Sequence, residues 1–257
     1  IASNDPVCLS NSLKDKRLRS SVLISWDEFS YTIDCSLDFR QQMLRENVQS
    51  LNGVFFTHEH ADHVGGVDDL RAYCYKIGDM PIYLNQRTLY SLEKRFEYIF
   101  SKENRYPGAP SVIPNIIDKT SFIVNDLEVI PIEVMHGKIP ITAYRFENFA
   151  YLTDVKSISE TEKIKLKNLD VLVVNALRIE EHPTHFNLEE ALRFVEEINL
   201  DSNSTEWLGS RIDLLNIDKK MISKDLNLHL DLSVDSYAPI KIHCKKLRIV
   251  KLAARTD

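Results

Sequence analysis

The sequence lacks several features that would assign the protein to a specialised class. Its four cysteines stand singly and far apart, so they do not form the closely spaced pattern of a disulfide framework. No apolar run approaches the roughly 18 residues that a membrane-spanning helix needs, and no signal peptide is recognisable. Internal repeats and low-complexity tracts are also missing. These absences favour a cytoplasmic globular protein without a membrane partner.

Charge is moderate and evenly spread. The chain is 27% charged, with a formal net charge of −6 at pH 7, and it contains no long block of like charges. Such a chain does not predict a nucleic-acid surface, so nucleic acid is the less favoured partner, although a local basic patch stays open. A chain of 257 residues, 44% of them hydrophobic, is long enough to bury a substantial core. We expect a single domain over 1–257, with a divergent part at 200–257.

Strand-like and helix-like segments alternate from residue 20 to residue 198. Strands or hairpins are predicted at 20–26, 30–36, 51–58, 80–85, 121–136, 141–154 and 169–177, and helices at 37–47, 66–77, 86–100, 158–168 and 187–198. The proline-containing segment 101–115 is predicted to be a loop. Strands mixed with helices in both halves predict an α/β (α+β) fold, an αββα sandwich of two sheets with helices outside.

The densest group of metal-binding side chains is HEHADH at 58–63, directly after an apolar strand. Three of the eight histidines of the chain lie there. Imidazole and carboxylate groups offer lone pairs near neutral pH, so they are natural metal ligands. A turn can aim His58 and His60 to one side and Asp62 and His63 to a neighbouring point. One loop can therefore supply ligands to two adjacent metals.

Two neighbouring features refine this interpretation. Gly65 and Gly66 allow the backbone to bend closely around the loop and to begin the next helix. Glu59 and Ala61 are expected to point away from the site. The alternative is a surface loop with chance histidines, since the spacing is not the HExxH of helical zinc proteases.

The complete HxHxDH pattern at 58–63 resembles the signature of the metallo-β-lactamase superfamily. The resemblance implies an αββα fold and a hydrolytic site with one or two metal ions, and we expect two divalent ions here. A later histidine of the family, at the end of a strand, corresponds to His136, and its bridging aspartate corresponds to Asp154. Histidine with carboxylate suits zinc, manganese and iron.

Three segments, 15–21, 57–71 and 183–192, resemble the PhnP-type phosphodiesterases of this superfamily and, more distantly, tRNase Z. That resemblance implies hydrolysis of a small or cyclic phosphodiester through a metal-bound hydroxide. Asp62 and His185 are then the catalytic residues: Asp62 orients the hydroxide, and His185 assists the leaving group. His182 is expected to face solvent.

Two departures from the family pattern leave alternatives open. The N-terminal cysteine cluster that holds a structural zinc in PhnP-like members is reduced to Cys8. The last histidine ligand is missing from 200–210, and only His229 and His243 follow. The alternatives are a tRNA 3′-processing nuclease, a thioester or lactone hydrolase, and a catalytically impaired metal-binding member. A homodimer is compatible with the sequence.

Overall fold

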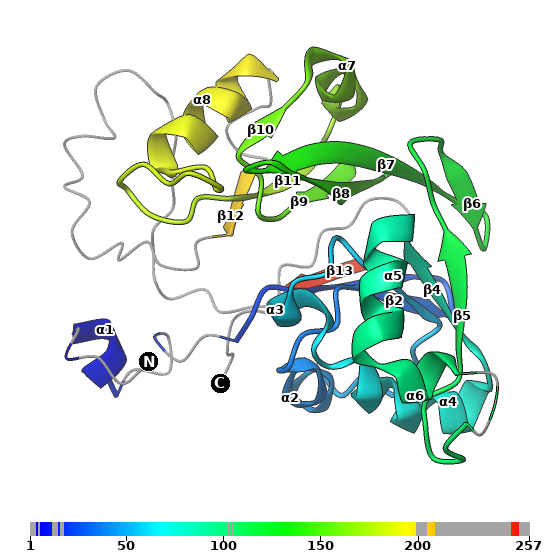
Figure 1. Cartoon of the computed structure of the whole chain (residues 1–257). Helices are drawn as coiled ribbons and strands as arrows, with labels where there is room; N and C mark the ends of the chain where they lie inside the picture. Colours follow the sequence, from blue (N-terminus) through cyan, green and yellow to red (C-terminus); the bar gives the residue numbers. More distant parts are fainter. Residues whose placement is uncertain are drawn as a thin grey trace. The chain divides into compact units, whose positions relative to one another are not determined.

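The computed structural model describes residues 4, 6–11, 15, 18–101, 103, 105–198, 205–208 and 248–251. The chain divides into two compact units. The N-terminal unit comprises Lys16–Thr120 with Ala238–Asp257, and the C-terminal unit comprises Ser121–Tyr237 with Ile1–Asp15. Each unit contains one β-sheet with its own helices (Figure 1). The predicted α/β class with two sheets is therefore confirmed.

The sheet of the N-terminal unit has the strand order β13-β1-β2-β3-β4-β5. Its strands are β1 (Val22–Trp26), β2 (Phe29–Ile33), β3 (Gly53–Phe55), β4 (Met80–Leu84), β5 (Val112–Ile116) and β13 (Arg248–Lys251). The β1–β2 pair is antiparallel, and the strands from β2 to β5 are parallel. Parallel neighbours need crossover connections, which the helices supply. These helices are α2 (Phe39–Arg45), α3 (Ala61–Val64), η2 (Val67–Leu70), α4 (Arg71–Ile77), α5 (Gln86–Arg95) and α6 (Glu97–Phe100).

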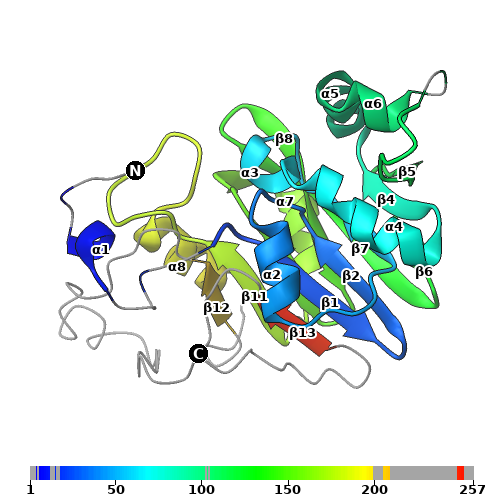
Figure 2. The same cartoon turned by 90° about the horizontal axis from the view of Figure 1, so that it is seen from below.

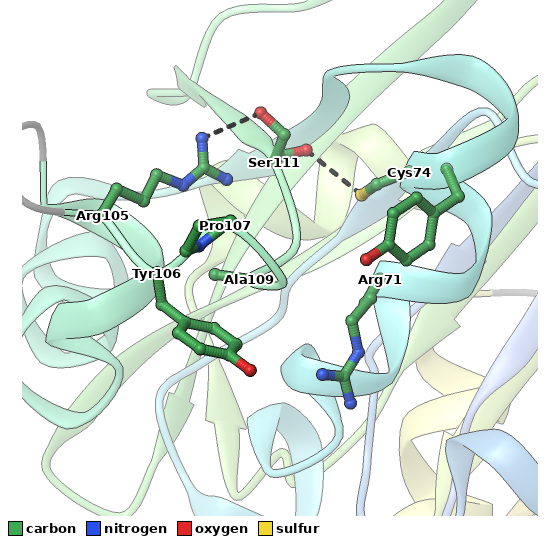
Figure 3. A pocket seen from close by; sticks show the side chains of 8 residues that line it. Arg71, Cys74, Arg105, Tyr106, Pro107, Ala109 and Ser111 are labelled. Carbon is green, nitrogen blue, oxygen red and sulfur yellow. Dashed lines mark hydrogen bonds between the residues drawn. The ribbon is translucent and has the colours of Figure 1, made fainter.

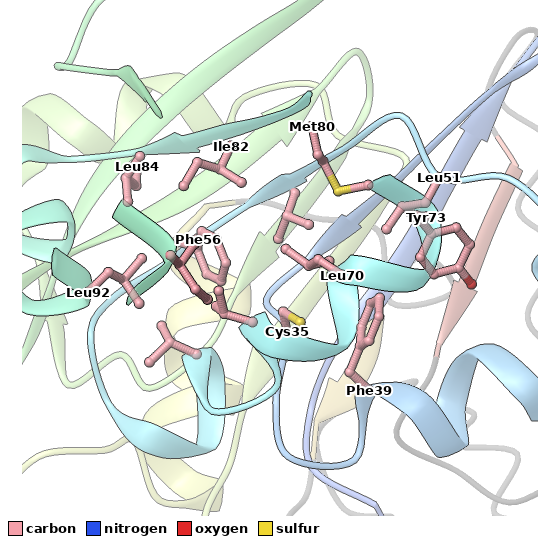
Figure 4. Packing of buried hydrophobic residues seen from close by; sticks show 14 of the residues in the cluster. Cys35, Phe39, Leu51, Phe56, Leu70, Tyr73, Met80, Ile82, Leu84 and Leu92 are labelled. Carbon is pink, nitrogen blue, oxygen red and sulfur yellow. The ribbon is translucent and has the colours of Figure 1, made fainter. Parts of the chain in front are cut away.

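The core of this unit forms because its strands are apolar on both faces, as expected of a buried parallel sheet. On one face, Phe56 and Met80 pack with Leu70 and Leu92 of the helices, and all four are fully buried (Figure 4). On the other face Phe55 stacks on Tyr83, with ring centroids 4.8 Å apart. Alternate residues of a strand point to opposite faces, so one short strand supplies both layers.

The sheet of the C-terminal unit has the order β10-β7-β8-β9-β11-β12, with β6 paired to β7. Its strands are β6 (Phe122–Val124), β7 (Leu127–His136), β8 (Ile139–Phe146), β9 (Phe149–Leu152), β10 (Ser157–Ile158), β11 (Val171–Asn175) and β12 (Thr205–Leu208). The β7-β8-β9 meander is antiparallel, whereas β9, β11 and β12 are parallel. The helices of this unit are α1 (Pro6–Leu9), α7 (Glu160–Lys163), η3 (Ile164–Leu166) and α8 (Leu188–Glu197).

The predicted capping of the helix at 187–198 is confirmed. The Asn187 side chain accepts a hydrogen bond from the Glu190 backbone N–H, and the Glu190 carboxylate accepts one from the Asn187 N–H. This reciprocal capping box fixes where α8 begins and where the loop before it ends. Ala191 and Phe194 are buried on the inner face of α8, among the apolar side chains of its own unit.

Two local predictions are wrong. The helix expected over 86–100 is broken at Phe96, whose φ of −122° and ψ of 43° leave the helical region. The loop expected over 101–115 instead leads into β5, which pairs with β4 at the edge of its sheet. Pro114 lies within β5, and an edge strand tolerates a proline because one side of it forms no ladder.

The tail beyond residue 198 contributes an edge strand to each sheet. β12 pairs with β11, and β13 pairs with β1 (Figure 2). The sequence of this tail also has two strand-like pieces, at 226–234 and 240–250. The second overlaps β13, whereas the first lies outside the described residues. Among the helices that the structure describes, none combines the length and the apolar character that crossing a membrane requires.

Candidate functional site

In the N-terminal unit, the histidine-rich loop connects β3 to α3. His60 is the N-cap of α3 and has extended backbone, so His58 and His60 precede the helix while Asp62 and His63 lie in its single turn. The Nε2 atom of His58 is 3.1 Å from Nδ1 of His60. The Nε2 atom of His63 is 3.6 Å from the Asp62 carboxylate. The side-chain nitrogen and oxygen atoms of these four residues, which are potential metal ligands, are therefore held in two close pairs.

Asp34 anchors the histidine-rich loop through hydrogen bonds, and this role was not predicted from the sequence. It follows β2, the parallel neighbour of β3, and it is fully buried with a left-handed φ of 65°. Its carboxylate accepts hydrogen bonds from the Thr57 N–H at 2.8 Å, the Thr57 hydroxyl at 2.9 Å and His63 Nδ1 at 2.7 Å. Burial raises the pKa of Asp34 above its usual 3.8, while His63 and Thr57 oppose that rise.

These contacts define which ring nitrogens carry lone pairs. Thr57 has a single hydroxyl proton, and it donates that proton to Asp34. The Thr57 oxygen, 3.0 Å from His58 Nδ1, therefore accepts from that nitrogen. His63 likewise donates from Nδ1 to Asp34. In the neutral form of each ring the lone pair is then on Nε2, the arrangement that partners beyond the metal ligands commonly impose on histidine ligands.

Glu59, which is expected to point away from the site, is turned toward α5. Its carboxylate forms an ion pair with Arg87 at 2.7 Å, and its carbonyl oxygen accepts from Arg95 Nη1 at 2.6 Å. These two arginines anchor the backbone of the loop between His58 and His60. Hydrogen bonds to Asp34 and contacts with two arginines of α5 therefore hold the loop in place.

Glycine is required at position 66 because a side chain would not fit there. Replacing Gly66 with alanine is expected to destabilise the unit by about 3 kcal/mol. A Cβ atom there would lie 2.0 Å from the carbonyl oxygen of Ser36, whereas φ at Gly66 is an ordinary −96°. Gly78→Ala is the matched control: nothing lies within 4 Å of its Cβ, and only its φ of 81° opposes the change. We expect about 1 kcal/mol there. Urea unfolding measures both; equal losses would contradict the steric explanation.

In the C-terminal unit, three polar side chains meet where strands end. His136 is the last residue of β7, Asp154 follows β9 with a left-handed φ of 54°, and His185 lies in the loop before α8. The rings of His136 and His185 have centroids 4.5 Å apart. His185 Nε2 is 3.5 Å from Asp154 Oδ1. His136 donates from Nδ1 to the Thr184 carbonyl at 2.8 Å, so its lone pair also resides on Nε2.

Backbone hydrogen bonds tie the His185 loop to the Asp154 turn. The Phe186 N–H donates to the Val155 carbonyl at 2.7 Å. The side chain of Asn175, at the end of β11, accepts from the Val155 N–H at 2.7 Å and donates to the Val155 carbonyl. Asp154 and His185 therefore keep a fixed separation although 30 residues lie between them in the chain.

His182 is partly exposed, and it also takes part in a hydrogen-bond cluster with Thr184 and His185 that the sequence did not predict. It is half-buried, and its Nδ1 accepts a hydrogen bond from the Thr184 N–H at 3.3 Å. The same nitrogen lies 3.1 Å from His185 Nδ1, so His185 donates to it. Burial, followed by the nearby charges of His185 and Arg178, lowers the pKa of His182 below its usual 6.5. His182 thus fixes the ring of His185.

The described residues contain every predicted site residue except the candidates for the last ligand, His229 and His243, which lie outside them. Histidine and aspartate side chains able to bind a metal ion occur in each unit. In the N-terminal unit they are His58, His60, Asp62 and His63, and in the C-terminal unit they are His136 and Asp154.

Comparison with known proteins gives a family match and several relatives. Residues 30–213 match the model of a family described as the beta-lactamase superfamily domain. A crystal structure of a diphosphatase from the PhnP family is 33% identical, with a TM-score of 0.73, and the match covers 80% of this chain and 78% of that one.

Two curated relatives match this chain over only part of their own length. The octanoyltransferase of Porphyromonas gingivalis is 43% identical over 195 residues, which is 75% of this chain and 39% of that protein. The exodeoxyribonuclease YycJ of Bacillus anthracis is 28% identical over 180 residues, 63% of this chain and 62% of that protein. The chain therefore spans less than two thirds of either relative.

Proposed function

This chain belongs to the metallo-β-lactamase superfamily, close to its PhnP-type members, and from that membership we propose that it is a phosphodiesterase. The family is one of metal-binding hydrolases. The proposed substrate is a small or cyclic phosphodiester, attacked by water. The observation that carries the proposal is the shared orientation of three histidines. His58, His63 and His136 each engage Nδ1 with an acceptor and have their lone pair on Nε2.

The donor set fits divalent cations. Neutral imidazoles and carboxylates are the ligands that zinc, manganese and iron accept from proteins. We propose that His58, His60 and His136 would hold one ion, and that Asp62, His63 and Asp154 would hold a second. Bound ions of this kind lower the pKa of a water and neutralise charge on phosphoryl oxygens.

The chain's own side chains supply orientation and a proton. The Asp62 side chain is 58% exposed, so its carboxylate can accept a hydrogen bond from the attacking water and aim it at phosphorus. His185 donates a proton to the departing oxygen. Its Nδ1 is held by Thr184 and His182, and its Nε2 lies 3.5 Å from the Asp154 carboxylate, so the ring is fixed on both sides.

A second candidate function has a specific basis. The 33%-identical structure is a diphosphatase, so hydrolysis of a diphosphate bond by the same residues is the nearest alternative. The octanoyltransferase gives a weaker indication, because the match covers only 39% of that protein and its name describes the whole. A tRNA 3′-processing nuclease and a thioester or lactone hydrolase stay further alternatives.

The test is a metal measurement paired with a substrate panel. The purified chain, supplied with Zn²⁺ or Mn²⁺, is assayed on bis(p-nitrophenyl) phosphate, a cyclic phosphodiester, a diphosphate ester and a thioester. We expect two equivalents of metal, turnover of the diesters that does not change with salt, and loss of both in His60→Ala. Fastest turnover of the diphosphate ester would favour the second candidate. No metal and no turnover would indicate a catalytically impaired member.

His182→Ala is expected to lower kcat about tenfold with little change in KM. The reason is that His185 loses the acceptor that holds its ring, while no contact to the substrate is removed. His182→Asn should recover part of the rate, because an amide oxygen can accept the same hydrogen bond. Equal rates in both variants, or a change confined to KM, would contradict a positioning role. Circular dichroism confirms that each variant is folded.

A further inference from the structure

The N-terminal unit contains a pocket that the proposed hydrolysis does not use. It lies between α4 and the segment 105–111, and it has a volume of about 270 Å³ (Figure 3). Small-molecule pockets typically measure roughly 300–1,000 Å³, so this one is near the small end of that range. The side chains of Arg71 and Tyr106 line it from opposite sides, and Cys74 and Ser111 close its inner end.

Two guanidinium groups give the pocket a positive side. Arg105 donates from Nη1 to the Ser111 hydroxyl at 3.1 Å and from Nη2 to the Pro110 carbonyl. Both acceptors are uncharged, so they orient the guanidinium without neutralising it, although Ser111 in turn donates to Asp79. Arg71 pairs with Asp68 at 3.1 Å, with both side chains well exposed, and such a pair is weak in water. Either arginine can therefore engage an incoming anion.

Two tyrosines give the pocket an aromatic rim. Tyr75 is 75% exposed and Tyr106 is 62% exposed. The Tyr106 ring lies against Gly108, where a Cβ atom would come within 2.8 Å of its Cε1 atom. The glycine therefore leaves room for the ring in its present position. One exposed tyrosine is ordinary, but two that border the same cavity as two arginines form a surface on which a flat ring can stack.

We propose that this pocket binds a nucleotide, with its base stacked on Tyr106 or Tyr75 and its phosphate at Arg71 and Arg105. Stacking on an aromatic face combined with arginine at the phosphate is the chemistry by which proteins hold single nucleotides without reading their sequence. The nucleotide is either free or one unit of a single strand. This inference does not depend on the proposed hydrolysis.

The test uses the full-length His60→Ala variant, so that binding at the metal centre does not contribute. Adenosine 5′-monophosphate and a deoxythymidine decamer are titrated by calorimetry. In this background, Tyr106→Ala and Arg71→Ala are each expected to weaken binding at least about fivefold. The matched controls are Tyr90→Ala, a tyrosine on α5 that is 57% exposed, and Arg193→Ala, an exposed arginine on α8 paired with Glu189. Both controls should leave the Kd unchanged.

The titrations distinguish a site for free nucleotides from a site for a single strand. Equal affinity for the mononucleotide and the decamer supports a site for free nucleotides, whereas tighter, salt-dependent binding of the decamer supports a site for a strand. The proposal is overturned if neither probe binds, if the pocket variants bind as tightly as the controls, or if inorganic phosphate competes as well as the mononucleotide. Thermal unfolding establishes that the pocket variants are folded.

Discussion

Replacing His136 with alanine is expected to lower the rate of phosphodiester hydrolysis by about 10³-fold. His136 is the last residue of β7, and its Nδ1 donates a hydrogen bond to the Thr184 carbonyl. This hydrogen bond fixes the ring, so Nε2 is the atom that would bind a metal ion. A flexible side chain would not replace it. Its loss removes one ligand of the first proposed ion. Metal interactions stabilise the transition state by several kcal/mol, and each 1.36 kcal/mol corresponds to tenfold in rate.

Two measurements and one control isolate this effect. Metal content and kcat/KM are determined for His136→Ala and for Met135→Ala. Met135 is the preceding residue of β7, and its side chain points to the opposite face, so it reports on disturbance of the strand alone. We expect metal loss only in His136→Ala. Retention of metal and activity there would remove His136 from the ligand set and would place the whole assignment of the C-terminal unit in question.

His136 and Asp154 can be proposed from the sequence because both follow strands whose alternation is plain in the local pattern. Each also stands in the family's order after the HEHADH motif. The strands that carry them are found where expected: β6 and β7 form the hairpin predicted at 121–136, and β8 and β9 form the one predicted at 141–154. A ligand that ends a strand can be recognised from its own neighbours in the chain.

Asp34 and His182 could not be found in this way, because their roles depend on contacts distant in sequence or on loop conformation. Asp34 lies 29 residues before His63, and the two meet only because β2 and β3 are parallel neighbours. The role of His182 requires a loop that folds back so that two imidazoles face each other. An acid directly after a strand, in TIDC, was the only local signal for Asp34.

The fold shows the same division between local and distant causes. Helical periodicity continues through 86–100, but the backbone leaves the helix at Phe96, whose side chain packs against the core of the N-terminal unit. Tertiary packing there outweighs local preference. β12 and β13 pair with strands that precede them by more than 30 and 200 residues, respectively. No local sequence pattern predicts such distant partners.

Asp34→Ala is expected to destabilise the protein by about 3 kcal/mol and to weaken metal binding about 10- to 100-fold. The substitution leaves the Thr57 N–H, the Thr57 hydroxyl and His63 Nδ1 without the buried acceptor they share. Asp34→Asn should lie between this variant and the unaltered protein, because its amide keeps one accepting oxygen and replaces the other with a donor.

The matched control is Asp38→Ala. Asp38 accepts two hydrogen bonds from Arg19, which is exposed, and removing such a surface pair should cost less than about 1 kcal/mol. Urea unfolding and metal titration together separate two roles of Asp34. If stability falls while metal affinity stays, Asp34 serves the fold alone. If both fall, the same carboxylate joins two strands and sets the lone pairs of His58 and His63, so that folding of the N-terminal unit itself prepares the metal ligands.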